Sequence, residues 1–183
     1  MAITISGDSP NLTSAGLASP AFSGTPTGTG VLTSGTAVAS TSGTSIDFTS
    51  IPSWVKRITV ACKDVQTNGT SYKLVQIGSG SIVTSGYTSY ASVVSSTGNG
   101  FIGSSAGMIV LADSSSLGFS GQVVLTLVGS NTWCSSYAGQ ATSDAASFGG
   151  GNIVLGGTLD RVRFTTVNGT DTFDAGLINI LYE

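Results

Sequence analysis

The chain of 183 residues contains no histidine and only two cysteines. Without histidine, the commonest general base near neutral pH is missing, and so are the Ser-His-Asp and Cys-His nucleophile systems. Two distant cysteines cannot complete a tetrahedral zinc site on their own. No glycine-rich segment ends in the Lys-Ser/Thr pair of a phosphate-binding loop. We therefore expect no catalytic residues and no cofactor, and we predict that the protein is not an enzyme.

Charge is also scarce: charged residues make up 8% of the chain, against about 25% in ordinary domains. The net charge is −3 and the six basic residues are scattered, whereas nucleic-acid binding needs clustered Lys and Arg. No apolar run approaches the roughly 18 residues of a membrane span, and the N-terminus lacks the basic and apolar regions of a signal peptide. We expect no nucleic-acid partner, no membrane insertion, and synthesis in a cytoplasm.

The two cysteines are expected to stay reduced in that compartment. Cys62 lies in the strand-like run "ITVACK", and Cys134 lies in "NTWCSSY". Both are interpreted as small buried hydrophobic residues. A disulfide between them is the alternative.

The sequence is rich in glycine, serine and threonine, yet 40% of its residues are hydrophobic. From residue 36 onward, short apolar runs alternate with glycine-bearing turn signals, as in antiparallel β proteins. In "VKRITVACK", Ile58, Val60 and Cys62 alternate with polar or small residues, which is the period of a half-buried strand. The pattern predicts an all-β fold, an antiparallel β-sandwich or jelly-roll-like domain over residues 35–183.

Residues 1–34 differ from the remainder of the chain. They hold three of its four prolines and no basic residue. Such composition favours extended backbone. We predict an extended N-terminal arm, and a flexible tail is the alternative.

The run "QVVLTLVG" at residues 122–129 is apolar on both faces of the expected strand. A strand of an antiparallel sandwich commonly has one solvated face. The run therefore predicts either a central strand covered on both sides or a contact with another subunit. We favour the subunit contact.

Three carboxylates, Asp160, Asp171 and Asp174, lie close together near the C-terminus. An Asn-Gly turn signal at residues 168–169 places Asp171 and Asp174 in a wide loop between two strands. Asp160 begins the first of these strands and is expected at its far end. We interpret Asp171 and Asp174 as turn residues that accept backbone N–H groups, with a calcium site as the weaker alternative.

Residues 84–106, "TSGYTSYASVVSSTGNGFIGSSA", form a long, polar, loop-like stretch that contains several aromatic rings. Exposed rings beside hydroxyl and amide groups are typical of sugar-binding surfaces. The stretch predicts a receptor-binding platform. Its residues would be Tyr87, Tyr90, Asn99 and Phe101, while core or subunit packing of the rings is the alternative.

The segments "IDFTSIPSWVKRITV" and "LDRVRFTTVNGTDTFDAGLINILYE" resemble a Gly/Ser/Thr-rich β domain. This domain occurs in tail-fibre and other virion surface proteins of tailed bacteriophages and prophages, and the resemblance covers roughly residues 35–183. It implies a trimeric virion appendage that often faces the host. No catalytic residues are assigned by it.

The resemblance therefore predicts a structural virion protein, a short tail fibre or appendage that forms a homotrimer. Residues 1–34 would dock it to other virion proteins, and a host cell-surface glycan is the candidate receptor. The alternatives are a capsid decoration or head fibre protein and a sugar-binding receptor-recognition domain. A polysaccharide depolymerase is a weaker third alternative, because no acid pair faces an evident cleft.

Overall fold

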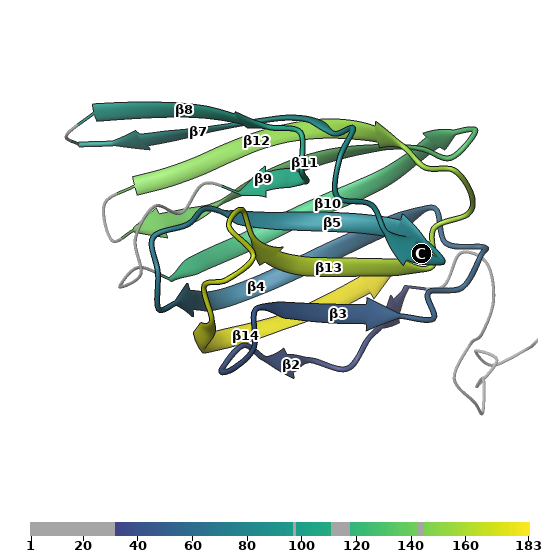
Figure 1. Ribbon diagram of the computed structural model, residues 1–183, viewed down its shortest axis with the longest axis horizontal. Coiled ribbons are helices and arrows are strands. Elements are labelled where there is room, and N and C mark those ends of the chain that lie inside the picture. Colours follow the sequence, from purple (N-terminus) through teal and green to yellow (C-terminus); the bar gives the residue numbers. More distant parts are fainter. Residues whose placement is uncertain (1–31, 97, 111–117, 143–144) are drawn as a thin grey trace, which may run out of the picture.

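The protein folds into two antiparallel β-sheets, as the alternating apolar pattern predicts (Figure 1). The computed structural model describes residues 32–183 except 97, 111–117 and 143–144. These described residues form strands joined by turns and no helix, so the prediction of an all-β antiparallel fold is confirmed. They accordingly include no helix of the length and apolarity that a membrane crossing requires.

The larger sheet has nine strands in the order β1-β14-β4-β10-β11-β12-β7-β8, with β2 beside β14. Its strands are β1 (Thr33–Ser34), β2 (Val38–Ala39), β4 (Arg57–Thr67), β7 (Thr88–Ser95), β8 (Gly98–Ser104), β10 (Phe119–Gly129), β11 (Thr132–Thr142), β12 (Ala145–Val154) and β14 (Phe173–Tyr182). The smaller sheet has five strands in the order β3-β13-β5-β6, with β9 beside β5. Its strands are β3 (Ser45–Thr49), β5 (Lys73–Ser79), β6 (Ser81–Ile82), β9 (Met108–Val110) and β13 (Arg161–Thr166).

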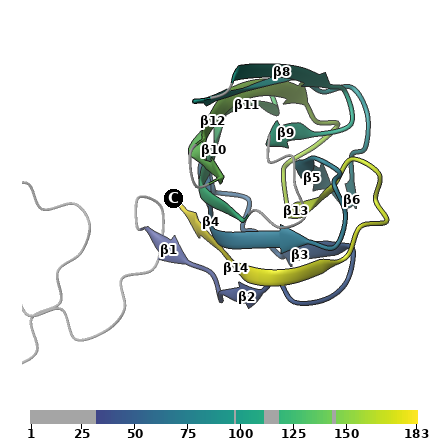
Figure 2. The ribbon, with the colours of Figure 1, turned by 90° about the vertical axis from the view of Figure 1, so that its left-hand side faces the viewer.

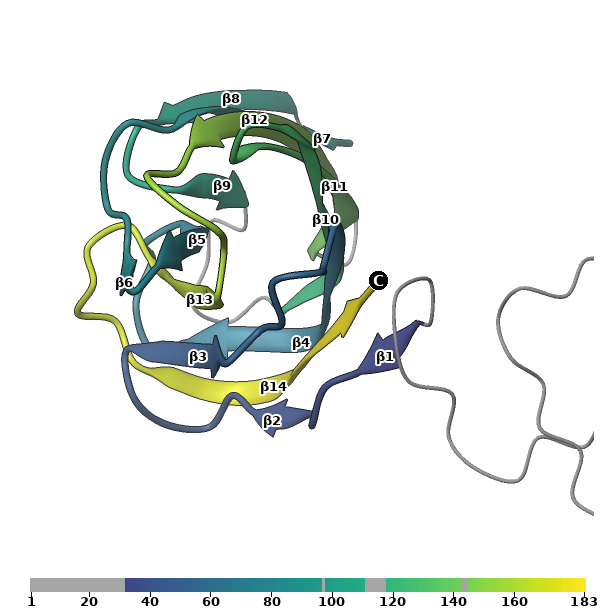
Figure 3. The same cartoon turned by 90° about the vertical axis from the view of Figure 1, so that its right-hand side faces the viewer.

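The nine-stranded sheet curves around the smaller one, and the core lies between them (Figures 2 and 3). Ile58 and Val60 of β4 are fully buried, in agreement with the predicted alternation. Facing them from the smaller sheet, Val162 and Phe164 of β13 are also fully buried. Burial of such side chains contributes about 1.5–3 kcal/mol each, and this packing makes the scaffold a two-layer sandwich.

β10 lies between β4 and β11, in the middle of the large sheet. Val123 and Leu125 project into the core, whereas Val124 is half-buried and Val128 is 69% exposed on the outer face. The two-sided apolar pattern thus gives one core face and one solvent-facing apolar face. The predicted subunit contact stays a prediction.

Asp160 lies apart from Asp171, as predicted. Asp171 accepts a hydrogen bond from the Ser71 N–H at 2.9 Å and another from the Asn168 side-chain amide at 2.5 Å. Asp160, at the opposite end of β13, accepts one from the Gly80 N–H at 3.1 Å. Within the described part of the chain, no group of three His, Cys, Asp or Glu side chains could hold a metal ion.

Two details of this region differ from the prediction. Asp174 lies on β14 with its side chain exposed, and not in the loop. β13 and β14 also belong to different sheets, because the segment between them crosses from one layer to the other. Asp171 is therefore the carboxylate that braces this crossing.

The two cysteines occupy opposite faces of the large sheet, and both are free thiols. Cys62 is buried, which confirms its prediction, and burial raises the pKa of its thiol to about 12 although nearby Lys73 lowers it in part. The prediction for Cys134 was wrong: it is exposed, since its strand position opposes Thr126 and Asn152 on the outer face. The two thiols therefore do not form a disulfide.

The chain enters the large sheet at β1, where Thr33 and Ser34 pair with Tyr182 and Leu181 of β14. The Gly35 N–H donates to the Ile180 carbonyl at 2.7 Å. The sheet thus begins two residues inside the range predicted for the arm. Residues 1–31 of the predicted arm lie outside the described residues.

Candidate functional site

The stretch at residues 84–106, predicted to be loop-rich, contains the antiparallel hairpin of β7 and β8. Ser92 pairs with Phe101, and Val94 pairs with Asn99. β8 is the last strand at this end of the large sheet. The prediction of a long loop was wrong because serine and glycine, which are weak strand formers, here occupy paired positions on a sheet.

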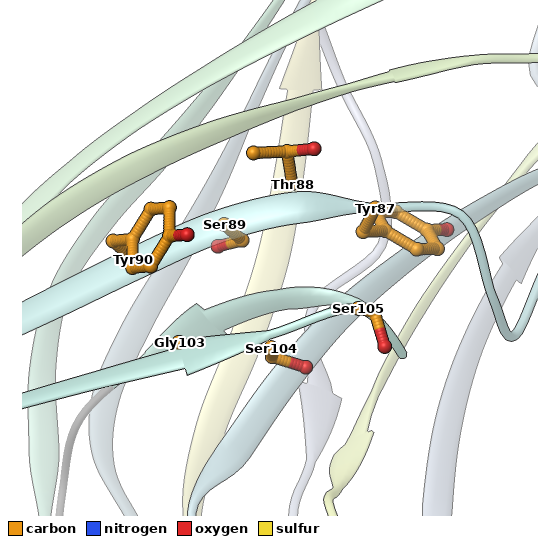
Figure 4. A pocket seen from close by; sticks show the side chains of 7 residues that line it. All are labelled: Tyr87, Thr88, Ser89, Tyr90, Gly103, Ser104 and Ser105. Atoms are coloured by element: carbon orange, nitrogen blue, oxygen red, sulfur yellow. The ribbon is translucent and has the colours of Figure 1, made fainter.

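Tyr87, one of the predicted receptor-binding residues, is a core residue and is only 3% exposed. Its hydroxyl accepts a hydrogen bond from the Ile77 N–H at 2.8 Å and lies 3.0 Å from the Val83 carbonyl. Burial raises the pKa of Tyr87 to about 12. An exposed ring at Tyr87 is thus ruled out, because residues three apart along extended backbone project to opposite faces. Figure 4 shows the rings of Tyr87 and Tyr90 at opposite ends of their segment.

Tyr90 and Phe101 form a stacked pair on the outer face, with ring centroids 5.4 Å apart and ring planes 9° apart. They are 52% and 72% exposed. Asn99, also exposed, lies on the same face of β8, two residues from Phe101. The structure therefore brings three of the four predicted residues together.

Glycine at position 103 makes room for this pair. Gly103 is the cross-strand partner of Tyr90, and a Cβ at this position would lie 2.8 Å from Cε1 of the Tyr90 ring. Beside Tyr90 is a shallow groove of about 260 Å³. Its lining, drawn in Figure 4, is mostly hydroxyl-bearing: Tyr87, Thr88, Ser89, Tyr90, Gly103, Ser104 and Ser105.

A third exposed ring, Phe148 of β12, was missed by the sequence reasoning. In the sheet register Ser92 has Phe148 as its partner on one side and Phe101 on the other. Along β7, Ser92 is flanked two residues away by Tyr90 and Val94, which is 49% exposed. We name this arrangement the Ser92 notch: Ser92 surrounded by Tyr90, Val94, Phe101 and Phe148.

The notch belongs to a wide surface without charge. None of the chain's charged residues lies in β7, β8, β10, β11 or β12. The six basic residues are Lys56, Arg57, Lys63, Lys73, Arg161 and Arg163. We call the outer face of these five strands the uncharged face.

The chemistry available on this face is that of binding. Aromatic rings, hydroxyls and amides can contact a ligand by stacking and by hydrogen bonding. The acid–base groups of the described residues lie on other elements, apart from the phenols of Tyr90 and Tyr137 and the Cys134 thiol. The site therefore favours recognition of an uncharged ligand.

No protein-family model, curated protein or solved structure shows significant similarity to the chain. The fold and the site define the class of the protein: it is an all-β sandwich whose large sheet presents an uncharged face with exposed aromatic rings.

Proposed function

We propose that this chain is a non-enzymatic structural protein on the virion surface of a tailed bacteriophage. It would act as a short tail fibre or appendage that faces the host. The resemblance of its sequence to Gly/Ser/Thr-rich virion domains supports this role. So does the all-β fold, whose surface is covered largely by hydroxyls and small side chains.

The observation that carries the proposal is that the N-terminal entry and the exposed aromatic rings lie at opposite ends of the large sheet. β1, where the chain enters, and β8, which carries Phe101, are the two ends of the strand order. Figure 3 shows β1 and β2 on the side of the molecule away from β7 and β8. An arm leaving at β1 can therefore attach to a particle while the aromatic edge remains free for the host.

Between these two edges, β10 and β11 present a shallow hollow of about 580 Å³. Its lining is uncharged: Gly121, Gln122, Val124, Ser136, Tyr137 and Ala138. A subunit contact here would cover the outer face of β10 and would border the Ser92 notch, because Ala138 in the hollow pairs with Phe148. It would leave β7 and β8 uncovered, since β11 and β12 separate them from β10. A homotrimer of this kind would present three notches on one appendage.

The test is the location of the protein in particles. Virions or induced prophage particles from a strain that carries the coding sequence are purified, and the protein is sought by mass spectrometry and by immunogold labelling of residues 35–183. Label on the tail supports the proposal. Label on the head would replace it with a capsid decoration or head fibre protein, and absence from particles would overturn both.

The arm is tested with a truncated chain that begins at Leu32, which retains the pairing of β1 with β14. We expect it to fold and assemble as the full chain does but to be absent from particles. Normal incorporation would show that residues 1–31 are not the attachment. A matched chain that lacks only residues 2–8 controls for shortening as such.

A further inference from the structure

We propose that the Ser92 notch binds one neutral sugar residue of a surface glycan. The biological meaning of this inference rests on the proposed host-facing function, but the binding is measurable by itself. It narrows the candidate ligand from a surface glycan to a neutral sugar residue, and it adds Phe148, Val94 and Ser92 to the residues that form the site.

The walls of the notch are apolar and open to solvent. Phe101 is 72% exposed and Phe148 is 49% exposed, and the two residues flank Ser92 on the neighbouring strands. Two adjacent strand spacings place their Cα atoms about 10 Å apart, and Tyr90 and Val94 lie about 13 Å apart along β7. Phe101 is stacked on Tyr90, and the exposed faces of these rings and of Phe148 offer a surface on which the C–H faces of one sugar ring would pack.

The floor of the notch is polar. The Ser92 side chain is half-buried, and within the described part of the chain its hydroxyl has no hydrogen-bond partner. Asn99 adds an exposed amide beside Phe101 and Val94. A few placed polar groups within an apolar lining are the usual arrangement of ligand sites, and hydroxyl and amide groups match the donors and acceptors of a sugar.

The absence of charge decides between kinds of glycan. An acidic sugar is held most strongly by Arg or Lys through charge-assisted hydrogen bonds. All six basic residues lie outside the five strands of the uncharged face. A neutral sugar requires no oppositely charged partner, so the absence of Lys and Arg does not weaken its binding. The notch therefore favours neutral over acidic glycans.

A protein partner is the competing occupant, because exposed apolar patches also mark protein interfaces. Stable protein interfaces bury about 1,200–2,000 Å² in total and have apolar cores. The notch instead has a hydroxyl at its centre, and the cross-strand neighbours of its rim are the small or polar residues Asn99, Gly103, Ala146 and Gly150. These features favour the sugar, and the test below includes the other outcome.

The full chain is passed over immobilised neutral polysaccharides (dextran, mannan and galactan) and over acidic ones (polygalacturonate and polysialic acid). We expect retention on at least one neutral polysaccharide and no stronger retention on the acidic ones. Retention should change less than two-fold when salt rises from about 0.05 to 0.5 M, because no ion pair is screened. Phe101→Ala and Phe148→Ala should each weaken it at least ten-fold.

Leu177→Ala is the matched control, since Leu177 is an exposed apolar residue on β14, outside the notch. It should retain binding within two-fold. Ser92→Trp, which fills the notch, should abolish binding while the melting temperature and oligomeric state stay unchanged.

Retention on acidic polysaccharides alone, or on none, overturns the inference. A change of oligomeric state in Phe101→Ala would identify the notch as a contact between copies and would also overturn it. Failure of the inference leaves the particle-location experiment unaffected. Neutral-glycan binding by a protein that is absent from particles would reject the virion function and leave the inference standing.

Discussion

At the residue scale, Tyr87 links three segments of the core through one hydroxyl. That hydroxyl receives the Ile77 N–H and can donate to the Ile77 or the Val83 carbonyl, at 3.1 and 3.0 Å. Tyr87→Phe keeps the ring but leaves the buried Ile77 N–H without its acceptor. The penalty for such an orphaned group is about 1–3 kcal/mol, and we expect a loss of this size in urea-induced unfolding.

Tyr90→Phe is the control for this substitution, because Tyr90 is 52% exposed and its hydroxyl can be solvated. It should change the free energy of unfolding by less than about 0.5 kcal/mol. Equal effects of the two substitutions would contradict the assignment of Tyr87 to the core and Tyr90 to the surface.

The two thiols should differ in reactivity by their position on the sheet. Since the thiolate is the reactive form and the pKa of Cys62 is raised from 9.0 to about 12, Cys62 should stay unreactive in the folded protein at pH 8. Cys134 is exposed and should react promptly with a chromogenic disulfide reagent. We expect one thiol to titrate in the native state and the second only in denaturant.

The pKa of Cys62 also gives the sign of a pH effect. Its folded pKa lies above the unfolded value, so its contribution to stability is complete below pH 9 and is lost as the pH rises towards about 12. Cys62→Ser would not show this alkaline loss with the same amplitude. Rapid modification of both thiols at pH 8 would contradict the burial of Cys62.

Asp171 braces the crossing between the two sheets through its hydrogen bonds to Ser71 and Asn168. Asp171→Ala removes acceptors for the Ser71 N–H and the Asn168 amide, and we expect it to cost about 1 kcal/mol. Asp174→Ala is the matched control, since Asp174 is exposed on β14. EDTA should leave the melting temperature unchanged. A decrease that calcium restores would instead show that the carboxylates bind an ion.

At the element scale, the strands that could be predicted are those that alternate apolar and polar residues. β4, β13 and β14 show such alternation, and their buried faces are those expected from the pattern. β7, β8 and the first half of β12 could not be predicted from local sequence. Serines such as Ser89 and Ser147 take buried inward positions, while aromatic rings such as Phe101 take exposed outward ones, so long-range pairing decides their conformation.

The candidate site shows the same division. Tyr90, Asn99 and Phe101 were predicted from their chemistry. Tyr87 was wrongly expected to be exposed, because the stretch was interpreted as a loop, and the alternation of side chains between the two faces of a strand was not considered. Phe148 joins the notch through its register with Ser92, and a contact between residues so far apart in sequence leaves no local signal. Its exposed ring beside three glycines was the feature that could have pointed to it.

Those glycines, Gly149 to Gly151, lie within β12 and are not a flexible loop. A Cβ on Gly149 would lie 2.3 Å from the Tyr90 carbonyl oxygen and 2.6 Å from the Tyr137 ring. Because backbone cannot yield easily, we expect Gly149→Ala to destabilise the fold by about 1–3 kcal/mol, measured by thermal and urea unfolding.

Gly156→Ala is the matched control, because a Cβ there meets nothing within 4 Å. It should be neutral within about 0.5 kcal/mol. If Gly149→Ala were also neutral, the close packing of β12 against β7 and β11 would be contradicted.

At the scale of the whole molecule, charge and apolar exposure are segregated. The ion pairs Arg163–Asp47 and Arg57–Glu183 lie on β13, β3 and β4 or at the C-terminus, while the five strands from β10 to β8 carry none. One side of the molecule therefore carries the solvated ion pairs, and the other side is uncharged and suited to contacts. Three copies would convert weak single-site binding into useful avidity.

The prediction that belongs to this scale is the oligomeric state. Light scattering of the full chain at micromolar concentration should give a mass of three times 18.2 kDa.

Val128 is 69% exposed on the outer face of β10, so Val128→Lys should leave the subunit folded while placing a charge in the contact. We expect it to raise the dissociation constant of the trimer at least ten-fold, because a buried, unpaired charge is costly. Val167→Lys, an exposed valine just after β13, should leave the trimer intact. A monomeric full chain would reject the trimer, and a trimer insensitive to Val128→Lys would place the contact elsewhere than on β10.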